Sequence, residues 1–196
     1  MTSASIARAA ASRFSWGACC CCNAKPASRI ICAAGRSTTV RQELKESYGT
    51  LEEAKADISG LWALQRLVDQ GVLDKSLEHT MYTTFLASAF RSIRFGLNEA
   101  HGRGVALQLN SLLDAGAFTV RPDGTFTVDR AKVRVGVEAL TREILTIQAE
   151  GDAAKAKELI ATRAVIRPPV QQVLDRLKAV PVDIEPRFTV VDAPAR

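Results

Sequence analysis

The chain has 196 residues, of which 47% are hydrophobic and 24% are charged, and this composition is typical of a globular protein with one core. No run of about 18 apolar residues occurs, which excludes a membrane-spanning helix. The net charge of +5 comes from the N-terminal segment, because residues 1–42 carry six basic groups and no acid whereas the rest carries 20 basic and 21 acidic groups; nucleic-acid binding needs positive charge clustered on the folded body, so this function is excluded too.

The first 36 residues form a leader that is rich in Ala, Ser and Arg, lacks acids and holds all five cysteines of the chain. This composition is typical of an organellar transit peptide, which would direct the protein to a chloroplast or mitochondrion. An incorrectly joined upstream exon would give a sequence of similar composition, and the protein would then be cytoplasmic. In both cases we expect the leader to be disordered. The rest of the chain has no cysteine and fits a reducing compartment.

Two long helices are predicted next. From Glu43 to Gln70 apolar residues recur at intervals of three and four, as on one face of a helix, and Gly71 is a natural stop. A second pattern of this kind runs from Leu77 to Leu97 and predicts a long, substantially buried helix.

The rest of the body is predicted to be helical except for one hairpin. Helical spacing resumes around 107–113, and then residues 118–129 read FTVRPDGTFTVD, two β-branched and aromatic runs around a turn. Helices follow at about 130–150, 153–163 and 170–178, the last opened by Pro168-Pro169. The predicted fold is therefore mainly α, a helical domain over 37–180 with one small β-hairpin, followed by an extended tail over 181–196.

Glu53 and Asp57 are the main candidates for a metal site. They lie four residues apart in the sequence LEEAKAD, so a helix places them one above the other on one face. Such a pair can make half of a zinc site, one carboxylate binding the metal and the other steadying a ligand. The chain has only two histidines, His79 and His101, and no His-Glu-x-x-His pattern. A solvated helix face is the alternative interpretation of the two carboxylates.

The surroundings of the two carboxylates bear on this choice. On a helical wheel Gly60 and Leu64 share their side, while Leu51 and Trp62 lie opposite and are predicted to be buried. The helix should therefore be packed on both sides, with the carboxylates at the wall of a cleft.

A second small motif surrounds His101. Gly102-Arg103-Gly104 follows it directly, but no strand precedes this sequence and no Lys-Ser/Thr follows, so it is not a phosphate-binding loop. We expect the small residues to let the backbone approach a neighbouring element closely.

Four blocks of the sequence, residues 37–64, 81–110, 140–160 and 180–186, resemble the C-terminal part of the dipeptidyl peptidase III family of zinc metallopeptidases. The similar branch occurs in bacteria and is fused behind a Nudix hydrolase domain in plants. The resemblance implies that Glu53 is a zinc ligand and that Asp57 does not bind the metal itself but orients a ligating imidazole. It also implies that His101 lines the catalytic cleft, in contact with substrate or the developing oxyanion.

The resemblance is partial, because the family's His-Glu-x-x-(Gly-)His helix should lie upstream of LEEAKAD, where this chain has its leader. The predicted fold is thus part of a larger metallopeptidase that releases dipeptides from the N-termini of oligopeptides. We expect zinc and the oligopeptide substrate to bind only in the complete enzyme, together with the missing N-terminal part, and this chain alone to bind no zinc and to be inactive.

Two other functions stay open. The chain can be a non-catalytic helical interaction module in which the carboxylates are residual. It can also be the C-terminal region of a Nudix hydrolase fusion protein, although the Nudix pattern of clustered glutamates is absent from this sequence.

Overall fold

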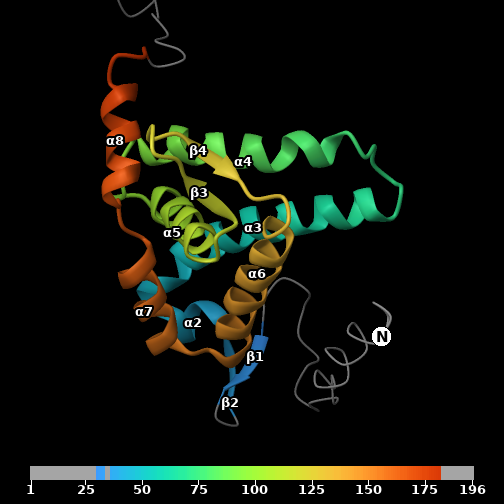
Figure 1. Ribbon diagram of the computed structural model, residues 1–196. Helices are drawn as coiled ribbons and strands as arrows, with labels where there is room; N and C mark the ends of the chain where they lie inside the picture. Colours follow the sequence, from blue (N-terminus) through green and yellow to red (C-terminus); the bar gives the residue numbers. More distant parts are fainter. Residues whose placement is uncertain (1–29, 34–35, 182–196) are drawn as a thin grey trace, which may run out of the picture.

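A long central helix, α3, organises the molecule, and the other helices pack around it (Figure 1). The computed structural model describes residues 30–33 and 36–181. Their elements in chain order are β1 (Ile30–Ala33), β2 (Arg36–Thr39), α2 (Val40–Leu44), the 3-10 helix η1 (Lys45–Ser47), α3 (Tyr48–Asp69), α4 (Leu77–Ile93), α5 (Ala100–Asp114), β3 (Phe118–Val120), β4 (Phe126–Val128), α6 (Val133–Glu150), α7 (Ala153–Arg163) and α8 (Pro168–Leu177). The predicted mainly α fold is confirmed.

Helix α3 is covered mainly by α5 and α6, and α4 runs beside it after the turn at residues 70–76 (Figure 1). Its apolar residues at intervals of three and four, including Leu51, Ile58 and Leu61, are buried as predicted. Trp62 is an exception, because 40% of it stays exposed. Its ring lies under the guanidinium of Arg66 at 6.0 Å, which is a favourable cation–π arrangement at the surface.

Several predicted helix ends match the structure because their local chemistry is strong. Gly71 has a φ of 72° just after α3, and Gly151 ends α6 with a φ of 66°, a backbone conformation that glycine adopts easily. The carboxylate of Asp152 then accepts the Lys155 N–H at 2.9 Å and caps α7. Pro168 opens α8, as predicted for a first-turn proline.

The boundary between α4 and α5 differs from the prediction. Helix α4 ends at Ile93 rather than near Leu97, because Gly96 takes a φ of 94° and breaks the helix. Helix α5 then begins at Ala100, which places His101 and Gly104 inside it. A sequence pattern based on apolar spacing misses this start, since the first turn of α5 has an exposed histidine and a buried glycine where a leucine would give the signal.

The predicted hairpin over residues 118–129 is confirmed. Phe118 pairs with Val128 and Val120 with Phe126 in an antiparallel arrangement. The turn is closed by Asp123, whose carboxylate accepts hydrogen bonds from the Thr125 backbone and hydroxyl at 2.9 and 2.6 Å. The hairpin packs on α4 and α5 through an edge-to-face contact of Phe90 and Phe126, with ring centroids 4.8 Å apart, and through buried Phe118.

A second short hairpin joins β1 and β2 and was not predicted. The strand Ile30–Ala33 lies within the expected leader (residues 1–36) and pairs with Arg36–Thr39. Thr39 then caps α2 in a reciprocal pair with Gln42. The remaining leader (residues 1–29 and 34–35) and the predicted tail after residue 181 lie outside the described residues. In the described part of the chain, no helix combines the length and apolar character needed to cross a membrane.

Candidate functional site

Glu53 and His101 meet at the surface between α3 and α5. His101 lies in the first turn of α5, and its Nδ1 is 3.5 Å from Oε2 of Glu53. Both side chains are about half exposed, at 51% and 49%, so this pair adds little to stability in high-dielectric surroundings. The two residues singled out from the sequence are therefore neighbours in space, and their polar atoms are accessible.

Gly104 allows α5 to approach α3 at this point. A Cβ atom at position 104 would lie 3.1 Å from the backbone nitrogen of Ala54, 3.2 Å from the carbonyl oxygen of Thr50 and 3.3 Å from Cβ of Glu53. These separations are shorter than ordinary van der Waals contacts, so only glycine fits here without a shift. Gly102 lets α5 lie close to the segment that precedes it, since a Cβ atom at position 102 would overlap the carbonyl oxygen of Gly96. The predicted close backbone approach of the Gly102-Arg103-Gly104 segment is confirmed.

Asp57 is held on the same face by Gln108, a residue that the sequence analysis did not identify. Gln108 is buried, and its Nε2 donates to the carbonyl oxygen of Ala54 at 3.1 Å and to Oδ2 of Asp57 at 3.3 Å. His101, Gly104 and Gln108 are spaced by three and four residues on α5 and therefore share one side of that helix. That spacing was the available signal, but it becomes meaningful only when α3 is known to lie opposite.

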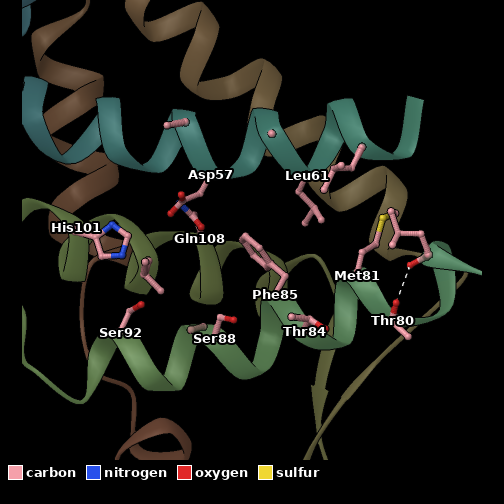
Figure 2. A pocket seen from close by; sticks show the side chains of 16 residues that line it. Asp57, Leu61, Thr80, Met81, Thr84, Phe85, Ser88, Ser92, His101 and Gln108 are labelled. Atoms are coloured by element: carbon pink, nitrogen blue, oxygen red, sulfur yellow. Dashed lines mark hydrogen bonds between the residues drawn. The ribbon is translucent and has the colours of Figure 1, made fainter. Parts of the chain in front are cut away.

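A groove of about 650 Å³ opens between α3, α4 and α5 (Figure 2). Asp57, Gln108 and His101 line one end of it, and Phe85 and Met81 extend the lining toward the other end. Gly60 and Leu64 line it too, as the shared side of the helical wheel indicated. One row of hydroxyl groups follows α4 at four-residue spacing along the groove: Thr80, Thr84, Ser88 and Ser92. The groove thus combines apolar walls with a polar end, the usual character of a ligand-binding cleft.

The opposite side of α3 is fixed by a buried polar cluster. Lys55 donates to Oε1 of Glu52 at 2.5 Å and to Oε1 of Gln148 on α6 at 3.1 Å, and Gln148 donates to Glu52 at 2.9 Å. This network joins α3 to α6 and limits rotation of α3 about its axis. Glu53 is thereby directed toward His101 of α5, and Asp57 toward the groove.

The candidate residues do not form a closed metal-binding set. Within residues 30–33 and 36–181, no three His, Cys, Asp or Glu side chains lie together in a way that could hold a metal ion. His79 lies near the start of α4, and its carbonyl oxygen accepts a hydrogen bond from Arg130 at 2.5 Å. Catalytic zinc sites use three protein ligands plus water, and the described residues do not supply such a set around Glu53.

Comparison with known proteins shows which solved structures this chain resembles. Dipeptidyl-peptidase III from Corallococcus sp. strain EGB is 60% identical with a TM-score of 0.79, and the match covers 84% of this chain and 31% of that chain. Dipeptidyl peptidase III from Caldithrix abyssi is 42% identical with the same TM-score, covering 84% of this chain and 32% of that one. The chain is therefore similar in sequence and fold to about a third of each of these two dipeptidyl peptidase III chains.

A third relative is named as a different kind of hydrolase. Nudix hydrolase 3 of Arabidopsis thaliana is 49% identical over 175 residues, which is 88% of this chain and 23% of that protein. The chain therefore spans less than a third of each of these three relatives. No protein-family model matches the sequence. The resemblance to dipeptidyl peptidase III predicted from the sequence is confirmed, and so is the similarity to a protein named as a Nudix hydrolase.

Proposed function

We propose that this chain forms one wall of the active site of a dipeptidyl peptidase III-like zinc peptidase, which releases dipeptides from the N-termini of oligopeptides. The observation that carries the proposal is the contact of Glu53 with His101, a residue of a different helix that lines the polar end of a groove. In this proposal Glu53 is a zinc ligand, Asp57 orients a ligating imidazole and His101 contacts the substrate. The proposal is supported by the similarity to two solved dipeptidyl peptidase III chains.

The fit of zinc to these residues is partial. The half-exposed carboxylate of Glu53 has only a 3.5 Å contact to a histidine and is suitable for a metal. The other ligands must come from elsewhere in the enzyme, because the chain has two histidines and one of them, His79, lies on the first turn of α4. Zinc bound in the complete enzyme would act as a Lewis acid and activate water. For the chain alone we derive no zinc-dependent step, and we propose that it is inactive by itself.

His101 has the clearest role among the residues of this chain. Its Nδ1 is turned to Glu53, so Nε2 is the atom available to a substrate, and it would donate to a substrate oxygen when both ring nitrogens are protonated. Its ring lines the groove near Asp57. A donor fixed at such a position stabilises negative charge that develops on the substrate.

The test combines the purified chain with the remaining two thirds of the Corallococcus enzyme and measures hydrolysis of a dipeptidyl-arylamide with added zinc. The chain alone should give no turnover, and the mixture should give zinc-dependent turnover. Glu53→Gln should abolish that turnover, whereas Glu138→Gln, a surface carboxylate paired with Arg142 on α6, should not. Activity of the chain alone would disprove the proposed inactivity. Turnover that survives Glu53→Gln would disprove the role of Glu53.

The similarity to Nudix hydrolase 3 favours a second candidate, in which the chain is one region of a fusion protein that also has a Nudix domain. The clustered glutamates of a Nudix site are absent here, so diphosphate hydrolysis would belong to another region. Sequencing the transcript upstream of Gly35 tests this. We expect a reading frame that encodes a Nudix motif first and His-Glu-x-x-His after it. A frame with neither motif would exclude the fusion.

A further inference from the structure

Gln108 lies between α3 and the groove and is only 1% exposed. Figure 2 shows its side chain beside Asp57, at the end of the groove where His101 also lies. Its Nε2 donates to the carbonyl oxygen of Ala54 and to Oδ2 of Asp57, at 3.1 and 3.3 Å. Gly104, one helical turn earlier, provides the close approach of the helices that makes both contacts possible.

These two contacts fix the orientation of the amide group. A carbonyl oxygen and a carboxylate are both acceptors, so the NH2 group and not the oxygen must point toward them. The amide oxygen Oε1 is then directed elsewhere, and it is buried without a hydrogen-bond partner among the described residues. A buried acceptor without a partner lowers stability.

Packing alone does not account for a glutamine at this position. Methionine has a similar length and would fill the space without a buried, unpaired oxygen. The carbonyl of Ala54, in the middle of α3, is already an acceptor within its own helix and does not need a second donor. What glutamine adds over methionine is therefore the hydrogen bond to Asp57.

We propose that Gln108 is a positioning residue for Asp57. It holds the carboxylate in one rotamer facing the polar end of the groove, and it acts through Asp57 rather than by touching substrate. This inference rests on the proposed function, in which Asp57 orients a ligating imidazole. Residues that orient the ligands of a metal typically affect activity or metal affinity 10- to 100-fold.

The first experiment uses the full chain alone and measures by NMR the three-bond couplings that report the χ1 angle of Asp57. In the wild type we expect one rotamer. Gln108→Met should give averaged couplings at Asp57 and a melting temperature at or above that of the wild type. Gln148→Met is the matched control, because Gln148 is also a buried glutamine that bonds a carboxylate of α3, but on the other side of that helix. The control should melt earlier and leave Asp57 in one rotamer.

Unchanged Asp57 couplings in Gln108→Met would overturn the proposal, and so would a clearly lower melting temperature, which would indicate a structural role. The second experiment measures dipeptidyl-arylamide hydrolysis by the two-part enzyme described above. There Gln108→Met should lower kcat about tenfold with little change in KM, and an unchanged kcat would also overturn it. If the wild-type mixture has no activity, the proposed function fails, and the Asp57 couplings alone decide the role of Gln108.

Discussion

Replacing Gly104 with alanine tests whether the close contact of α5 with α3 requires a residue without a side chain at position 104. The new Cβ would face three α3 atoms at 3.1 to 3.3 Å, two of them backbone atoms and the third Cβ of Glu53. None of these can move by a side-chain rotation, so the helices must separate slightly. Overpacking of this kind costs about 1–3 kcal/mol, whereas glycine to alanine in a helix interior contributes about 0.5–1 kcal/mol of stability. We expect a net loss of roughly 0.5–2 kcal/mol.

Gly60→Ala is the matched control, because Gly60 lies within α3 and a Cβ there would meet nothing within 4 Å. This variant should gain about 0.5–1 kcal/mol from the helix preference of alanine. Urea unfolding of the purified chain measures both free energies of unfolding. Gly104→Ala should also weaken the NMR contact between His101 and Glu53. A Gly104→Ala protein that is as stable as the Gly60→Ala protein would refute the argument that glycine is required by close packing.

Two further predictions concern stability and pH. Tyr82→Phe should lower the unfolding free energy by about 1–2 kcal/mol, because it leaves the buried Oε1 of Gln65 without the 2.8 Å hydrogen bond from the tyrosine. Burial raises the pKa of Tyr82 to about 12, so its contribution is complete below pH 10 and is lost as the pH rises through about 12, which urea unfolding at a series of alkaline pH values will measure. A difference from the wild type that persisted above pH 12 would contradict this.

For Asp114, hydrogen bonds from Arg167 at 2.5 and 2.9 Å lower the pKa of the carboxyl below its usual value of 3.8. The contribution of Asp114 is therefore present above pH 4 and is lost as the pH falls through the lower, folded-state pKa. Asp114→Asn should cost about 0.5–1 kcal/mol near pH 6, since the pair is partly exposed, and that cost should disappear in acid-unfolding measurements near pH 2. An equal cost at both pH values would exclude the ion pair as its source.

Much of the fold follows from local chemistry in the sequence. Helix α6 ends at a glycine, α7 begins after a capping aspartate and α8 begins at a proline. Their predicted ranges, and that of the hairpin at 118–129, lie close to those observed. The failures arise where local signals are weak. The start of α5 has no large apolar residue in its first turn. The strand β1, which pairs with β2, lies in a segment that composition alone assigned to the leader.

The sequence by itself determined the helix that carries Glu53 and Asp57 and the fact that both lie on one face of it, because the period of a helix is a local property. Only the tertiary structure decided what stands opposite that face. His101 and Gln108 reach it because Gly104 lets α5 approach closely and because the Lys55 cluster fixes the rotation of α3. Both effects depend on contacts between residues far apart in the chain, and such contacts leave no periodic signal in the sequence.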